Sequence, residues 1–117
     1  MEMLVRLRLE EILANARLAK QFLDGVDKQQ FASDIGRIYQ VAFAIGIVGE
    51  AAAQLSVVER AAINSIPWRQ MIDMRNRLIH GYQTLRPDIM FETVNGDFPP
   101  LIAELERILN EGPTNGR

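Results

Sequence analysis

The sequence predicts an all-α fold, a bundle of four main helices and one or two short ones. Apolar residues recur at helical spacing over long stretches, and no segment shows the alternation of a strand or an internal repeat. The length of 117 residues and a hydrophobic content of 48% fit one globular domain. We therefore expect a single domain over residues 1–111 and a flexible polar tail over residues 112–117.

The first half of the chain predicts two long helices. Residues 2–23 have an amphipathic pattern, which the turn formers of residues 24–27 interrupt. The second helix is expected to begin between 31 and 34 and to end near Gln54. It is apolar on nearly every side, and a domain this small has little protein to cover it, so we expect a second copy of the chain to do so. Its small residues would let another backbone approach: Ala42, Gly46, Gly49 and Ala53.

The stretch 38–58 is apolar enough to raise the question of a membrane span. Its glutamines and the carboxylate of Glu50 near its middle count against insertion. The N-terminus has no pattern of a secretion signal. We expect a cytoplasmic protein that does not contact a membrane.

The second half predicts a further series of helices. A short helix over about 58–63 is followed by a main helix from Trp68 to about Gly81, for which Pro67 is a favourable first-turn residue. Pro87 opens another short helix, and the last main helix starts near Phe98. Its apolar face predicts packing onto the rest of the bundle.

The helix that starts at Trp68 carries an arginine inside its apolar stripe. Positions 68, 71, 72, 75, 78, 79 and 82 share one face, and Arg75 is the charged residue among them. A buried guanidinium needs a partner, and Glu50 is the economical one. A structural ion pair or an exposed helix edge explains Glu50 as well as a supporting role in a functional site does.

The same helix carries the single histidine of the chain near its end. His80 lies four residues after Asn76, so the two side chains share a face, and Arg75 and Tyr82 lie close by. A neutral imidazole can take the proton of a ribose 2′-hydroxyl, and a fixed guanidinium can hold the phosphate oxygens. Flanking phosphates could be held by three more arginines within a few turns: Arg69, Arg77 and Arg86.

The composition limits the chemistry that the chain can perform. The absence of cysteine excludes disulfides, thiol nucleophiles and cysteine-bound zinc, and one histidine cannot form a multi-histidine metal site within a chain. The net charge of -2 leaves no general basic surface, so any nucleic-acid contact must be local. We expect phosphodiester chemistry, with no metal and no cofactor.

Several short motifs in order resemble one family. Arg75-Asn76-x-x-x-His80-x-Tyr82, preceded by Ile66-Pro67-Trp68 and Met74 and followed by Phe91-Glu92-Thr93-Val94, is similar to the HEPN superfamily. Gly49-Glu50-Ala51 on the second helix belongs to the same pattern. Within the superfamily the chain most resembles the HepT toxins of HepT/MntA toxin–antitoxin systems, of the type VII kind. The similarity runs from the first helix to about Leu109.

The resemblance implies a homodimeric HEPN-like bundle in which the motifs of two subunits face a shared cleft and act as a metal-independent endoribonuclease. Arg75 would stabilise the transition state, His80 would be the general base or acid, Asn76 would orient them and Tyr82 would complete the site. The product would be a 2′,3′-cyclic phosphate. The implied partner is a nucleotidyltransferase antitoxin, which in some systems transfers AMP from ATP to the motif tyrosine, here Tyr82.

The chain departs from the family on the turn before Gly49. Members often have charged residues there, where this chain has Phe43 and Gly46. Weaker RNA binding or a different pairing of subunits would follow. Two other interpretations remain: a non-catalytic HEPN-like dimer that binds RNA, a nucleotide or a protein, and a structural dimer in which Arg75 pairs with Glu50 across the interface.

Overall fold

The computed structural model describes residues 1–80 and 86–111, and within them it is all-α, as the sequence predicts. The helices are α1 (Met3–Phe22), α2 (Lys28–Ala32), α3 (Ile35–Ala53), α4 (Val57–Ala62), α5 (Trp68–Ile79), α6 (Pro87–Glu92), the π-helix η2 (Thr93–Asp97) and α7 (Phe98–Glu111). Four long helices are confirmed, and the short ones are more numerous than expected. The predictions for Gly81, Tyr82 and the tail concern residues outside the described part.

Side-chain caps explain where the helices begin. The Asp27 carboxylate accepts from the Gln30 backbone N–H while the Gln30 side chain accepts from the Asp27 N–H, which starts the unpredicted helix α2. Asp34 then caps α3 by accepting from the backbone N–H of Arg37. The predicted start of the second helix, between 31 and 34, is confirmed at its late end, since Asp34 is the N-cap and α2 occupies the chain up to Ala32.

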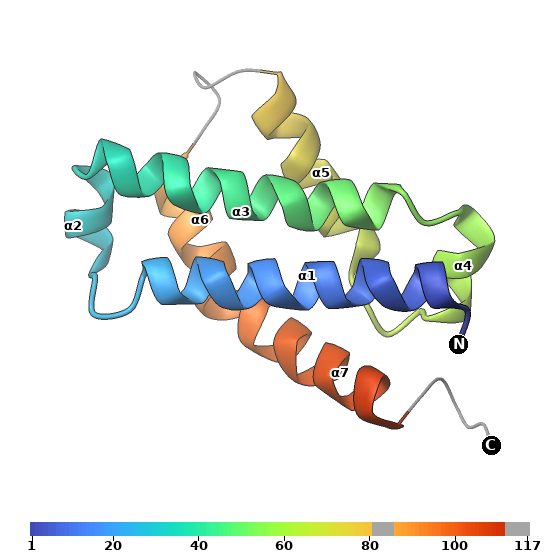
Figure 1. Cartoon of the computed structure of the whole chain (residues 1–117). Helices are drawn as coiled ribbons and strands as arrows, with labels where there is room; N and C mark the ends of the chain where they lie inside the picture. The colour runs from blue at the N-terminus through green and yellow to red at the C-terminus, as the bar shows by residue number, and fades with distance from the viewer. Residues whose placement is uncertain (81–85, 112–117) are drawn as a thin grey trace.

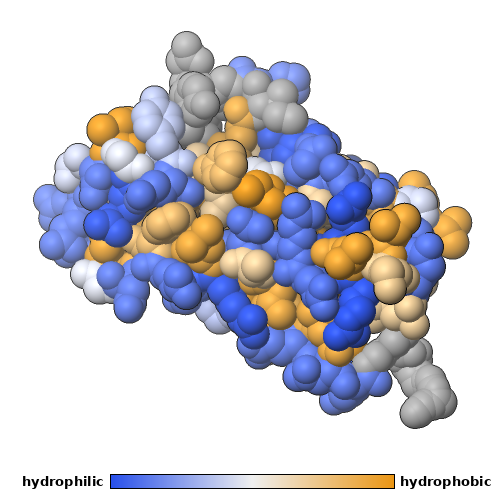
Figure 2. Space-filling view, in the orientation of Figure 1, coloured by the Kyte–Doolittle hydropathy of each residue, from blue (hydrophilic) through white to orange (hydrophobic). Residues whose placement is uncertain are grey.

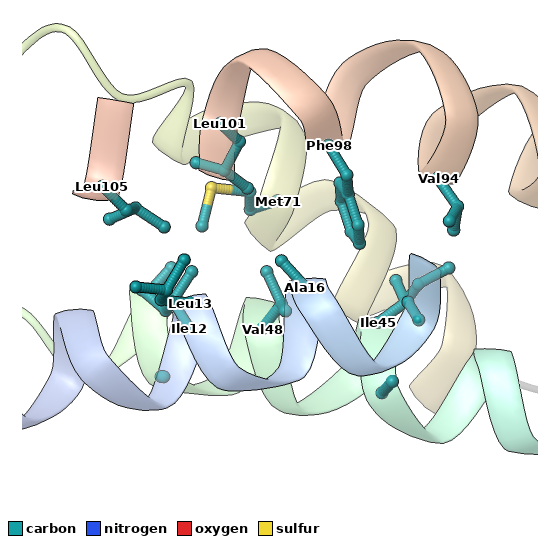
Figure 3. Packing of buried hydrophobic residues seen from close by; sticks show 14 of the residues in the cluster. Ile12, Leu13, Ala16, Ile45, Val48, Met71, Val94, Phe98, Leu101 and Leu105 are labelled. Carbon is teal, nitrogen blue, oxygen red and sulfur yellow. The ribbon is translucent and has the colours of Figure 1, made fainter. Parts of the chain in front are cut away.

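The long helices pack in two layers around one core. Figure 1 shows α1 and α3 lying antiparallel, with α5 behind α3 and α7 crossing behind α1, and each of these pairs is in contact. Apolar side chains of α1, α3, α5 and α7 point toward one another between the layers (Figure 3). The labelled residues are Ile12, Leu13, Ala16, Ile45, Val48, Met71, Val94, Phe98, Leu101 and Leu105.

The second long helix, α3, is covered over most of its length by its own chain, so a second copy is needed only for the part that stays exposed. A Cβ atom built on Gly49 would lie 2.2 Å from the Arg75 Cβ and 2.6 Å from the Met71 carbonyl oxygen of α5. Gly49 thus serves a helix crossing inside the chain. The large apolar side chains that remain exposed on α3 form a stripe at helical spacing, Ile35, Tyr39 and Phe43.

Helix α3 also has the length and apolar composition of a membrane span. Half of its apolar window is buried inside the bundle, as in a core helix of a soluble protein. Packing against α1 and α5 accounts for the buried half of its apolar residues.

The start of α5 is fixed by two hydrogen-bonded links. The indole Nε1 of Trp68 donates to the carbonyl oxygens of Arg60, at 3.0 Å, and Ile63, at 2.9 Å. The Ser65 hydroxyl donates to Glu104 of α7 at 2.7 Å. Hydrogen bonds from Arg107 and Ser65 lower the pKa of the Glu104 carboxyl to about 2. The helix that carries the motif therefore starts from a position fixed against both α4 and α7.

Candidate active site

Arg75 projects from α5 onto α3 and pairs with Glu50. Its Nη1 donates to the Glu50 Oε1 at 2.9 Å, and the Arg75 side chain is 22% exposed against 53% for Glu50. The close crossing at Gly49 brings the base of the Arg75 side chain against α3, within reach of the carboxylate. The expected pairing of Glu50 with the motif is present, and it lies within one chain rather than across an interface.

The ion pair satisfies only part of the Arg75 guanidinium. The Arg75 Nε is buried and has no hydrogen-bond partner, and the bond to Glu50 is the one that the described structure gives its side chain. A guanidinium has five N–H donors, and a buried donor without a partner is costly. Arg75 therefore keeps donors for an anionic ligand, and Glu50 limits where the guanidinium can turn.

A hollow of about 690 Å³ lies beside this pair, and we name it the α3–α5 hollow. Its walls are mainly apolar, and its charged groups are Arg75 and Glu50. The lining includes Tyr39, Ala42, Phe43, Gly46 and Leu78. Figure 2 shows apolar surface among the hydrophilic residues on the face formed by α1 and α3. The candidate phosphate-binding arginine thus stands at the edge of an exposed apolar surface.

His80 lies at the exposed end of α5. It is the C-cap residue, and its backbone N–H donates to the Asn76 carbonyl oxygen at 3.1 Å. Helix geometry separates residues five apart by roughly 140° around the axis, so Arg75 faces α3 while His80 does not. In the described residues no side-chain hydrogen bond joins Asn76 to His80 or either of them to Arg75. The three residues share one end of α5 without direct contact.

The three arginines proposed for flanking phosphates lie apart. Arg86 makes two hydrogen bonds to Asp88, at 3.1 and 2.8 Å, and thereby lowers the pKa of the Asp88 carboxyl. Arg77 lines a separate cavity of about 290 Å³ between α3, α5 and α7, which also holds two aspartates. Arg69 is exposed near the start of α5. The three arginines therefore have different surroundings, and their role toward flanking phosphates stays a prediction.

Sequence reasoning missed the stripe of Ile35, Tyr39 and Phe43 as a separate surface. Their spacing of four residues is visible in the sequence. The signal is hidden because nearly every position of this helix is apolar, and only the packing of α1 and α5 tells which ones stay exposed.

The family comparison covers most of this structure. The model of the family described as Ribonuclease HepT-like matches residues 12–108, which include Glu50, Arg75 and His80. The chain belongs to the HepT-like ribonuclease family. This confirms the family that the motifs indicated.

Relatives of HepT-like type match over nearly their whole length. A Thermococcus cleftensis protein named "Probable ribonuclease HepT" is 30% identical over 100 residues, 86% of this chain and 91% of the relative. A candidate RNase of Methanocaldococcus jannaschii is 29% identical over 102 residues, 87% of this chain and 94% of the relative. A candidate RNase of Caldanaerobacter subterraneus is 27% identical over 103 residues, which are 88% of this chain and 92% of the relative. No solved structure matches the chain.

Proposed function

We propose that this HepT-like chain is a metal-independent endoribonuclease and the toxin of a HEPN/nucleotidyltransferase toxin–antitoxin system in the cytoplasm. The observation that carries the proposal is Arg75, held at the edge of a hollow by Glu50 and left with unsatisfied donors, on the same helix as an exposed His80. A general base and a charged donor to the phosphate oxygens are the two groups that serve RNA cleavage through the 2′-hydroxyl. Membership of a ribonuclease family supports RNA as the substrate.

The proposed reaction needs only groups of this chain and of the RNA. His80 takes the proton of a ribose 2′-hydroxyl, and that oxygen attacks the adjacent phosphorus while the bond to the 5′-oxygen breaks. The leaving 5′-oxygen takes up the proton that the His80 imidazolium gives back, and a 2′,3′-cyclic phosphate remains. Arg75 donates to the non-bridging oxygens, where negative charge builds up. Asn76 orients the pair.

The site is proposed to be completed by a second subunit. Arg75 and His80 of one chain point in different directions, so a shared cleft would bring each arginine near the histidine of the partner copy. The exposed stripe of Ile35, Tyr39 and Phe43, next to the α3–α5 hollow, supports this face as the dimer interface. In this arrangement Phe43 and Gly46, which replace charges common in the family, increase the apolar area of the interface.

Phe43→Asp is expected to give a monomer by sedimentation velocity, because a carboxylate would have to be buried at the interface. Phe43 is 71% exposed in the single chain, so its replacement should leave the helical content unchanged. The matched control is Val58→Asp on α4, since Val58 is 78% exposed and lies outside the stripe. If Phe43→Asp sediments as a dimer, as wild type is expected to do, this interface is contradicted.

We further propose that the partner is a nucleotidyltransferase antitoxin that transfers AMP to Tyr82. The modification would add negative charge and bulk two residues after His80, where the RNA phosphate must approach. Loss of cleavage would follow from repulsion and steric exclusion.

The decisive experiment is cleavage of RNA by the purified, unmodified protein in excess EDTA, with analysis of the product ends. We expect cleavage at the same rate with EDTA and with added Mg²⁺, and products that end in 2′,3′-cyclic phosphate. Activity that disappears in EDTA and returns with Mg²⁺ would contradict the metal-independent mechanism. A folded, unmodified dimer that binds RNA without cutting it would favour the non-catalytic binding module.

A further inference from the structure

Two arginines stand out because no other group of the described structure pairs with their guanidiniums. Among the described residues, Arg60 and Arg69 are the cationic side chains with no hydrogen bond or ion pair; the others each have a partner. The Nε of Arg60 is buried and unsatisfied. The two unpaired guanidinium charges call for an explanation, and an anionic ligand is one.

Both arginines line the same hollow, which we name the α4–α5 hollow. Its volume is about 560 Å³, and it lies between α4, the linker and the start of α5. The hydrogen bonds from Trp68 to the carbonyls of Arg60 and Ile63 fix the two helices relative to each other. The hollow is therefore formed before any ligand arrives, which lowers the entropic cost of binding.

The lining combines the groups that a nucleotide requires. Pro67 and Ile72 give apolar wall, while Asn64 and Asp73 offer an amide and a carboxylate to the edge of a base. The two guanidiniums can stack on a base or bind a phosphate, and they outweigh the single carboxylate of Asp73. The charge of the lining thus favours an anionic ligand that also has an aromatic part.

The α4–α5 hollow and the candidate active site lie along one side of α5. Arg69, Asp73, Asn76 and His80 follow one another at intervals of three or four residues, which places them along one stripe of the helix. The eleven positions from Arg69 to His80 correspond to a rise of roughly 16 Å. Figure 1 shows α5 leading away from α4 toward its C-terminal end. A single strand lying along this stripe would span both sites with a few nucleotides.

We propose that the α4–α5 hollow, through Arg60 and Arg69, binds a nucleotide of the RNA substrate that lies a few nucleotides along the strand from the scissile phosphate. This inference rests on the proposed ribonuclease function. It makes the hollow a determinant of which RNA is held in the site, whereas Arg75 and His80 act on the bond that is cut. Single-stranded RNA fits better than a duplex, because its bases are free to enter a hollow.

The test is binding of a fluorescent single-stranded RNA of about ten nucleotides by wild type, Arg60→Gln and Arg69→Gln. Ribose 2′-O-methyl groups prevent cleavage, so binding is read apart from catalysis. Each variant should bind about three- to tenfold more weakly, and the slope of log affinity against log salt should fall by about 0.7 per arginine. The matched control is Arg6→Gln on α1, which changes the net charge equally and should bind as wild type does.

Arg69 is exposed, so Arg69→Gln keeps the test valid if Arg60→Gln loses stability.

The possible outcomes distinguish the two proposals. If wild type binds the long RNA and both variants bind it with the same affinity and salt slope, the subsite is wrong and the ribonuclease proposal stands. If the variants bind RNA as wild type does but an antitoxin protein no longer co-purifies with them, the hollow is a protein-docking site and the inference is overturned. If wild type binds the long RNA but cuts no RNA, the ribonuclease fails while weaker binding by the variants still supports the hollow. If wild type binds no RNA, both fail.

Discussion

His80→Ala is expected to lower the rate of RNA cleavage by about 10²- to 10⁴-fold, the usual contribution of a general acid or base. His80 is exposed at the end of α5, and the described structure gives its side chain no hydrogen bond, so the substitution should cost little stability. Cleavage is measured on a defined RNA at saturating and limiting protein. Thermal unfolding and sedimentation verify that fold and assembly are retained.

The matched control for His80→Ala is Gln70→Ala, another exposed polar residue of the same helix. It should cut RNA at the wild-type rate. Arg75→Ala gives a further comparison, because it removes the phosphate ligand and leaves the Glu50 carboxylate without its partner. If Arg75 is only structural, Arg75→Ala lowers the unfolding temperature while His80→Ala cuts as fast as wild type. That pair of results would refute catalysis by the motif.

The sequence could predict the long helices because each buries a stripe of apolar residues at a period of 3.6. In α1, Val5, Leu9, Ile12 and Ala16 are buried as the spacing indicates. The same spacing cannot tell which neighbour covers a helix that is apolar all round. From the sequence, Gly49 permits the approach of another backbone without saying which one, and in the structure that backbone is α5 of its own chain.

The candidate site was predictable in its residue types and only in part in its geometry. The pairing of Arg75 with Glu50 follows from two isolated charges in apolar stretches, each of which needs a partner. The α4–α5 hollow does not follow from the sequence. It depends on the angle between two helices, which the hydrogen bonds of Trp68 to the carbonyls of Arg60 and Ile63 determine.

Gly49→Ala is expected to have the largest effect on stability, since the crossing of α3 and α5 leaves no room for a methyl group. A Cβ atom at this position would lie 2.2 Å from the Arg75 Cβ and 2.6 Å from the Met71 carbonyl oxygen. The helices must therefore move apart, at a cost of about 2–3 kcal/mol of unfolding free energy. The melting temperature should fall by roughly 10 °C.

The matched control lies one turn away on the same helix. A Cβ atom on Gly46 would lie 3.6 Å from the Leu78 Cδ1, an ordinary van der Waals distance. Gly46→Ala should therefore leave the unfolding free energy unchanged or raise it by up to about 1 kcal/mol through helix propensity. Urea unfolding of both variants at several protein concentrations separates the effect of the substitution from the effect of association. Equal midpoints for Gly49→Ala and Gly46→Ala would contradict the tight crossing. A loss of stability in Gly49→Ala but not in Gly46→Ala would support the tight contact between Arg75 and α3. The contact that excludes a methyl group is also the one that positions the guanidinium beside Glu50.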